Sequence, residues 1–263
     1  MKRLFGINSD CIKDVDEIKV LEIIKKVGFS SFFTDTCNNE KVKNIKAKAD
    51  DLGLTLEFLH APSRGINAMW EEGDGYLGIY NGMIEAIDSA SANNVPAVII
   101  HTSSGWTPPL LNDIGFSRYD KIVDYAKEKG VTLAFENLRS LSHVAFVVDR
   151  YRENENVRFC YDFGHEHCYT NTIKWPNIFT DKIICTHIHD NHGYFKGKDG
   201  DEHLLPYDGT IDYKSCISLL DKYNYKGSLM LEVFNSISEN YLKLSIEEFI
   251  QLAYDRLEKL SKA

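Results

Sequence analysis

The chain has 263 residues, of which 43% are hydrophobic, so it can bury a core of the size found in one α/β barrel. Its 30 lysines and arginines stand against 39 aspartates and glutamates. The resulting net charge of −9 argues against a generally basic surface for polyanions, although a local basic groove remains open. No apolar run approaches the roughly 20 residues that cross a bilayer, so the sequence predicts no membrane span. Six cysteines without a CxxC pair or a preceding secretory signal predict reduced thiols in a cytoplasmic protein.

Short runs of β-branched and aromatic residues alternate with amphipathic stretches along the chain, which is the pattern of repeated βα units. These runs predict eight strands near residues 4–8, 31–35, 54–60, 97–102, 132–137, 158–163, 184–189 and 228–233. Eight parallel strands can close into a barrel that carries its helices on the outside. We therefore expect residues 1–263 to form one domain, a single (β/α)8 TIM barrel.

Signals at the ends of the elements agree with this expectation. Left-handed helix C-caps favour glycine, and four glycines lie between a helical stretch and the next strand, namely Gly28, Gly53, Gly130 and Gly227. Ser245 and Glu248 predict a capping box at the start of the last helix. The connections 61–75 and 190–211 are longer than a simple barrel needs. Both follow strands, so we expect them to form lids or walls at the rim that carries the site.

Six of the predicted strands end in a side chain that can bind a metal: His60, His101, Glu136, Asp162, His187 and Glu232. All strand C-termini of a parallel barrel meet at one rim, so residues that are remote in sequence would converge there. A carboxylate at the end of an apolar strand is costly to bury without a cation, a partner or water. Each glutamate alone could merely cap a loop, but the six strand ends together indicate a hydrolytic or isomerising metalloenzyme.

Three closely spaced groups extend this set. Asp162 and His165 flank a turn at Gly164, so they could share one ion or serve neighbouring ions. His187 and His189 point to the same face of a strand, which allows one to be a ligand and the other a substrate contact or a structural histidine. Asp201 and His203 could chelate an ion from an extended loop or belong to a solvated charge cluster. The remaining histidines, His143, His167 and His192, are predicted to lie on the surface.

Other catalytic templates are absent from the sequence. It has no GxSxG elbow, no GxxxxGK[ST] loop, and no GxGxxG behind the first strand, which excludes the usual serine hydrolase and nucleotide-binding patterns. The loop tryptophan Trp106 could form an apolar wall against a sugar ring or could pack the rim.

The motifs FLHAPSRGIN, AVIIHTSSG, LAFENLR, FCYDFGHEH, THIHDN, DEHLLPYDGTID and LMLEVF, within residues 54–235, resemble the xylose isomerase-like barrel superfamily. This superfamily holds sugar and sugar-phosphate isomerases and epimerases, together with the second family of AP (abasic-site) endonucleases. The resemblance to the isomerase branch implies one Mn²⁺, Mg²⁺, Co²⁺ or Zn²⁺ ion bound by Glu136, Asp162, His187 and Glu232.

In that branch, two metal-bound glutamates exchange a proton at a carbon next to a carbonyl, and Glu136 and Glu232 match their positions. The resemblance also implies that His165 touches the substrate oxygen beside the reacting carbon. His189 and Trp106 are further candidate contacts to a sugar or sugar phosphate. Arg64, Arg139 and Lys196 fall in predicted rim loops, where they could meet a phosphate or carboxylate or could face solvent. The chain departs from the pattern at Gly193, where epimerases of free ketoses often carry an arginine, so the substrate contacts must differ.

The endonuclease branch is the alternative, because its three-zinc site uses nine ligands and the chain has a candidate for each. These candidates are His60, His101, Glu136, Asp162, His165, His187, Asp201, His203 and Glu232. Against a nuclease, the TDTCNNE loop lacks basic and aromatic residues, and Ser63 stands where that family leads us to expect an aromatic. Nucleic acid is therefore a disfavoured partner, but it is not excluded. Across the two alternatives the site would hold one to three metal ions.

Two further interpretations also remain. The same proton abstraction could serve a dehydratase or lyase, and a barrel could keep its metal site only to bind sugar. The sequence leaves the exact substrate and the oligomeric state open, a homo-oligomer included.

Overall fold

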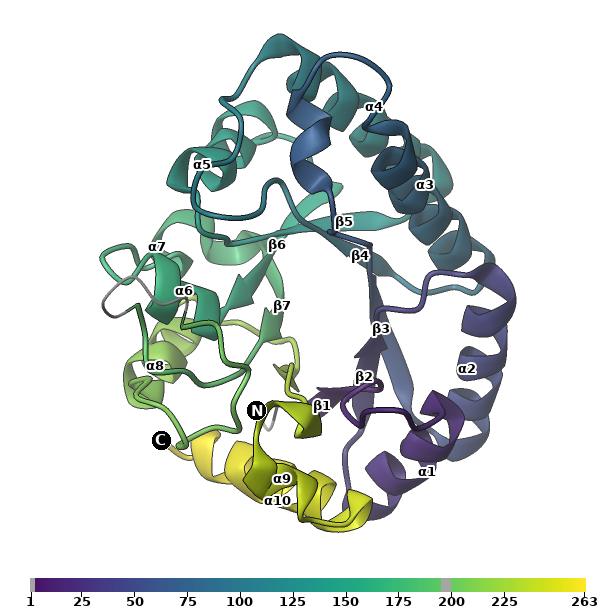
Figure 1. The fold of residues 1–263 in the computed structure, drawn as a ribbon, viewed down its shortest axis with the longest axis vertical. Coiled ribbons are helices and arrows are strands. Elements are labelled where there is room, and N and C mark those ends of the chain that lie inside the picture. The colour runs from purple at the N-terminus through teal and green to yellow at the C-terminus, as the bar shows by residue number, and fades with distance from the viewer. Residues whose placement is uncertain (1–2, 195–199) are drawn as a thin grey trace.

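The computed structural model describes residues 3–194 and 200–263, and it contains one sheet of eight parallel strands. In chain order the strands are β1 (Phe5–Asn8), β2 (Ser31–Thr34), β3 (Thr55–His60), β4 (Ala97–Ile100), β5 (Thr132–Glu136), β6 (Val157–Asp162), β7 (Ile183–His187) and β8 (Leu229–Leu231). Neighbours follow the chain from β1 to β7, and β8 lies beside β1. The strands surround the centre of the molecule as a nearly closed barrel (Figure 1).

Helices form a ring outside the strands (Figure 1). The longer helices are α1 (Glu17–Val27), α2 (Asn39–Leu52), α3 (Leu77–Ala92), α4 (Asp113–Lys129), α5 (Leu141–Arg150), α8 (Tyr213–Lys222) and α10 (Ile246–Leu260). Shorter elements are α6 (Phe163–Tyr169), α7 (Pro176–Phe179), α9 (Glu239–Leu242) and the 3-10 turns η1 (Ile66–Trp70), η2 (Thr180–Lys182) and η3 (Asn235–Ile237). A long helix follows every strand except β6, after which the short α6, α7 and η2 lead to β7. These crossovers carry the chain back so that each new strand runs parallel to the one before it.

The barrel closes between β7 and β8 through residues just beyond β7. Ile188 forms a parallel bridge with Leu231. The Ile188 amide donates to the Met230 carbonyl at 2.8 Å, and the Glu232 amide donates to the Ile188 carbonyl at 3.0 Å. We call this pairing the closure seam.

The apolar side chains form two cores, one between the sheet and the helices and one inside the barrel. The inner core contains Phe33, Phe58, Ala97, Ile99, Ala134, Cys160, Cys185 and Met230. Phe33 and Phe58 stack with ring centroids 5.0 Å apart, and Phe33 also stacks on His187 at 4.7 Å. The barrel is thus filled by side chains, which form a rigid floor beneath the residues of the rim.

The structure confirms the predicted barrel and the positions of its strands. The left-handed glycines predicted after three helices are present, with φ of 119° at Gly28, 63° at Gly53 and 70° at Gly130. Ser245 and Glu248 form the predicted capping box. All six cysteines are free in the structure.

The prediction for Gly227 was wrong. After α8 the left-handed position is taken by Asn224, with φ of 57°. Gly227 is required for close approach instead, because a Cβ there would lie 2.3 Å from the Tyr225 hydroxyl and 2.7 Å from the Ile184 carbonyl oxygen. The prediction that His143 lies on the surface was also wrong: it is 2% exposed, and its ring packs edge-on against Trp70.

Within the described residues, no helix combines the length and the apolar composition needed to span a bilayer.

Candidate metal centre

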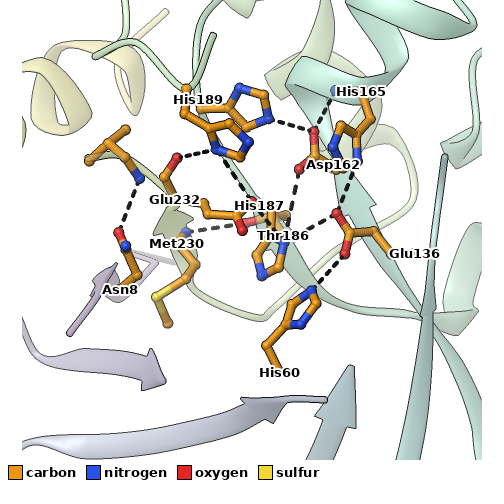
Figure 2. Close-up of polar contacts among 12 residues, drawn as sticks. Asn8, His60, Glu136, Asp162, His165, Thr186, His187, His189, Met230 and Glu232 are labelled. Carbon is orange, nitrogen blue, oxygen red and sulfur yellow. Dashed lines mark hydrogen bonds and ion pairs between the residues drawn. The ribbon is translucent and has the colours of Figure 1, made fainter. Parts of the chain in front are cut away.

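The side chains predicted from the strand ends do converge at the C-terminal rim. His60, Glu136, Asp162 and His187 are the last residues of β3, β5, β6 and β7, while His101 and Glu232 directly follow β4 and β8. Figure 2 shows Glu136 in contact with His60, His165 and His187, with Asp162 next to His165 and Glu232 on the other side of His187. The parallel barrel brings these remote residues together, as the strand-end pattern predicts.

The central group consists of Glu136, Asp162, His187 and Glu232, whose potential ligand atoms all lie within 4.8 Å of one another. The His187 Nδ1 atom is 3.3 Å from Glu136 Oε1, 3.2 Å from Glu232 Oε2 and 3.9 Å from Asp162 Oδ2. His187 and Asp162 are fully buried, and Glu136 is 1% exposed. Three carboxylates therefore surround one imidazole in a place with little access to water.

A second group lies on the other side of Glu136. Its Oε2 atom is 3.3 Å from His60 Nε2 and 3.0 Å from His101 Nε2. Because Oε1 faces His187, the single carboxylate of Glu136 joins the second group to the central one.

A third group contains His165, His189, Asp201 and His203. The Asp201 carboxylate lies 3.5 Å from His165 Nε2, 3.6 Å from His189 Nε2 and 3.4 Å from His203 Nε2. The rings of His189 and His203 stack with centroids 3.9 Å apart. The long loop after β7 thus delivers Asp201 and His203 to the rim, as its predicted place beside the site required.

Backbone carbonyls fix the orientation of three histidines. The Nδ1 atom of His60 donates to the Ala61 carbonyl at 2.9 Å, that of His165 to Asn137 at 2.9 Å, and that of His203 to Glu232 at 3.1 Å. In each case Nε2 then faces a carboxylate of the site. This is the arrangement that holds metal-ligating histidines in one tautomer and orientation.

The donor set fits a divalent cation. Asp162 Oδ2, Asp201 Oδ1 and Glu232 Oε2 are buried and lack a hydrogen-bond partner. Buried carboxylate oxygens without partners are costly unless a cation is present, and mixed imidazole and carboxylate ligands suit zinc, manganese, cobalt and related ions. Glu136, Asp162, His187 and Glu232 could hold one ion, and the other two groups could hold further ions.

The charges of the cluster shift its pKa values in opposite directions. Burial lowers the pKa of His60, but the hydrogen bond that His60 donates to Glu136 and the charge of Asp35 outweigh burial and raise this pKa to about 10. Burial raises the pKa of Glu136, yet His187 and His101 hold it well below its usual range. Glu136 thus favours the charged form of His60, whereas burial lowers the pKa of His101. A histidine must lose the proton on its ligand atom when it binds a metal.

Hydrogen bonds and close packing around Asp162 position two residues of the third group, His165 and His189. Asp162 caps α6 by accepting from the His165 amide at 2.6 Å, and Asn137 exchanges two hydrogen bonds of 2.8 Å with the Asp162 backbone. Gly164 leaves room for the His189 ring, because a Cβ there would lie 2.0 Å from its Cε1 atom. The predicted bend at Gly164 therefore also serves close packing.

The other predicted substrate contacts differ in their placement. The Arg139 Nη2 atom is 3.9 Å from Asp201 Oδ2, and its guanidinium lies 4.0 Å from the centre of the Tyr169 ring. Trp106 is 48% exposed and contacts the rings of Tyr169 and Tyr194. Arg64 is exposed and is not among the residues lining the cavity, while Lys196 lies outside the described residues. Their roles in binding stay predictions.

A cavity of about 330 Å³ opens over these groups. Besides the expected histidines and carboxylates, Asp35, Ser63, Ser103 and Phe234 line it. Asp35 and Ser103 were missed by the sequence reasoning. Asp35 follows β2, so the strand-end rule that identified the other residues would have found it, whereas nothing in the sequence singles out Ser103.

Fold and site together define a (β/α)8 barrel with a cluster of histidines and carboxylates at its C-terminal rim. The family model described as "Xylose isomerase-like TIM barrel" matches residues 21–252. The chain belongs to this family, which confirms the predicted resemblance.

Relatives by sequence include proteins from two bacteria. The chain is 26% identical to the uncharacterized protein y4fM of Sinorhizobium fredii, over 90% of each chain. It is 25% identical to an inosose dehydratase of Glaesserella parasuis, over 78% of this chain and 67% of the relative.

Solved structures agree in fold at lower identity. A 3-keto-D-glucoside 4-epimerase from E. coli superposes with a TM-score of 0.75 and 15% identity, covering all of both chains. A structure of IOLI protein with a bound zinc atom has a TM-score of 0.75 and 18% identity, covering 99% of this chain and 98% of the other.

Proposed function

We propose that the protein is a metal-dependent isomerase or epimerase of a sugar or sugar phosphate. The observation that carries the proposal is the central group, in which two glutamates from separate strands flank one histidine within ligand distance. The names of the relatives, an inosose dehydratase and a sugar epimerase, support chemistry at a carbon beside a carbonyl. The zinc atom bound in the IOLI structure supports a metal in this chain as well.

Glu136, Asp162, His187 and Glu232 would hold the ion. A divalent metal, when bound, supplies a Lewis acid that stabilises the negative charge of an enediolate. The chain's own part is proton transfer: one of Glu136 and Glu232 removes the proton on the carbon next to the carbonyl, and the other returns it. Both carboxyls have a lowered pKa despite burial, mainly because of His187, so both are ionised and ready to accept a proton.

His165 and the buried surroundings complete the mechanism. His165 Nδ1 donates to the Asn137 carbonyl, and its Nε2 lies 3.5 Å from Asp201. In the proposed mechanism this Nε2 turns from Asp201 to a substrate oxygen beside the reacting carbon. The low exposure of Glu136 and His187 limits the access of bulk water to the reacting carbon.

The test is exchange of the substrate α-proton with solvent, followed by NMR in deuterated water with the metal-loaded protein and a panel of ketoses and inososes. Glu136→Gln and Glu232→Gln should each reduce exchange by about 10²- to 10⁴-fold, the usual contribution of a general base. Glu202→Gln, at a rim carboxylate that contacts only His192 among the described residues, should leave exchange unchanged. Full exchange in either active-site variant would remove that glutamate from the base role.

The product of the same incubation separates two related activities. An epimer or isomer would support the proposal, while loss of water from the substrate would favour a dehydratase. Binding without any exchange would favour a sugar-binding barrel that lacks turnover.

A zinc-dependent AP endonuclease is the second candidate, because the three groups contain all nine expected ligands. About three Zn²⁺ per chain, by plasma mass spectrometry on protein purified without a chelator, would favour it, and about one ion would favour the isomerase. Cleavage of a duplex with one abasic site, lost in His203→Ala, would establish the nuclease in place of the isomerase.

A further inference from the structure

One wall of the cavity is built from residues that belong to neither the proton-transfer pair nor the metal-ligand groups. Asp35 follows β2, and Ser103 follows β4. Both line the same cavity as His60, Glu136 and Glu232. Because they are neither proposed bases nor proposed metal ligands, these two residues are candidates to contact the part of a substrate that does not react.

The polar atoms of this wall are available to a ligand. Ser103 is 1% exposed, and its buried hydroxyl has no hydrogen-bond partner. Across residues 3–194 and 200–263, the Asp35 side chain forms no hydrogen bond or ion pair and is exposed at the cavity. A buried hydroxyl without a partner is unusual enough to call for an explanation, and a hydrogen-bonding ligand supplies one.

The charge of the wall restricts the kind of ligand. Asp35 faces a cavity that already contains Glu136, Asp201 and Glu232. Among the described lining residues, Arg139 is the one arginine or lysine, and it already lies beside Asp201. An ionised phosphate has only acceptor oxygens and would add negative charge beside these four carboxyl groups, whereas a sugar hydroxyl can donate to Asp35.

We propose that Asp35 and Ser103 form a hydroxyl-binding subsite that selects an uncharged polyhydroxylated ketone over its phosphate ester. Asp35 accepts a hydrogen bond from a hydroxyl on the unreactive part of the substrate, and Ser103 donates to or accepts from a second hydroxyl. This inference rests on the proposed function and narrows its substrate from sugars and sugar phosphates to unphosphorylated ones.

The experiment is isothermal titration of the Mn²⁺-loaded protein with matched pairs, D-fructose and D-tagatose against their 6-phosphates. We expect the free ketoses to bind at least about tenfold more tightly, because a hydrogen bond to a charged group is involved. Asp35→Asn should weaken the binding of the free ketoses. The dissociation constants of the two members of a pair should then lie within about threefold of each other, since the repulsion of the phosphate is gone. Ser103→Ala should weaken the binding of the free ketose and of its phosphate by the same factor.

Asp74→Asn is the matched control, because it removes an exposed carboxylate from the loop after β3 that does not line the cavity. It should leave the preference unchanged. Equal or tighter binding of the phosphates, an unchanged preference in Asp35→Asn, or no binding of any ketose would each overturn the inference.

Failure here is distinguishable from failure of the proposed function. Solvent exchange of the α-proton in a phosphorylated ketose would keep the isomerase and reject the subsite. Selective binding of free ketoses without exchange in any of them would keep the subsite and reject the isomerase.

Discussion

Gly164 illustrates at the residue scale how closely the site is packed. It is the second residue of α6, and helix propensity alone would favour alanine there by about 1 kcal/mol. A Cβ at this position, however, would lie within 2.4 Å of three atoms of the His189 ring. His189 is fully buried and stacked on His203, so the ring has little room to move.

We therefore expect Gly164→Ala to lower the free energy of unfolding by about 1–3 kcal/mol, the usual cost of overpacking, as measured by urea unfolding. Gly78→Ala, in α3, is the matched control because a Cβ there meets nothing within 4 Å, and it should stabilise slightly. Equal effects of the two substitutions would contradict the role given to the His189 ring.

Asp10, just beyond β1, predicts a pH dependence. Burial and the charge of Asp35 raise its pKa from 3.8 to about 7. Between these values the folded protein keeps a proton that the unfolded chain has lost, so the free energy of unfolding falls as the pH rises from 4 to 7.

Asp10→Asn should make the decrease in the free energy of unfolding between pH 4 and 7 smaller by about 1–2 kcal/mol, a value that allows for solvent screening. Urea unfolding across this pH range, with a chelator present, measures the change. Asp14→Asn removes an exposed carboxylate from the same loop and should preserve the slope. A slope that survives in Asp10→Asn would show that another group titrates.

The individual contacts between side chains of the site could not be predicted from the sequence. The strand-end pattern predicted that Glu136 and His187 would meet, because alternation and strand order follow from local periodicity. That Glu136 divides its two oxygens between His187 and the pair His60 and His101 depends on rotamers, which periodicity does not encode. Burial of His143 likewise follows from packing against Trp70, which lies far away in sequence.

At the scale of elements, caps explain why helix boundaries were predictable. In α10 the Ser245 hydroxyl accepts from the Glu248 amide at 3.3 Å, and a Glu248 carboxylate oxygen accepts from the Ser245 amide at 2.8 Å. Such caps are local in sequence, so they can be read before the fold is known. The cap at Asn224 was missed because asparagine takes the left-handed conformation less often than glycine.

Ser245→Ala should lower the free energy of unfolding by about 1 kcal/mol, because it leaves helix amides without an acceptor. Ser245→Asn keeps a capping side chain and should retain most of the stability. Urea denaturation of both variants measures the difference, and equal loss in the two would show that the cap is not the cause.

For the whole molecule, the metal centre should be a large contribution to stability. An ion at 100 times its dissociation constant adds about 2.7 kcal/mol, which for a chain of this size corresponds to roughly 5–10 °C in the melting temperature. We expect a chelator to lower the melting temperature by that amount in calorimetry, and added Mn²⁺ or Zn²⁺ to restore it.

His187→Ala should make the protein insensitive to the chelator, since it removes the ligand that faces all three central carboxylates. A melting temperature that the chelator does not change in the unmodified protein would argue that no ion is held at the rim.

The stabilisation expected from a bound ion would act at the closure seam. His187 and His189 flank Ile188 on one side of the seam, and Glu232 follows Leu231 on the other, so ligands come from both edges of the sheet where they join. An ion bound by both His187 and Glu232 would therefore link the two sides of the closure seam. Hydrogen exchange at the amides of Ile188 and Glu232 would then report metal occupancy directly, because loosening this joint is the shortest route to opening the sheet.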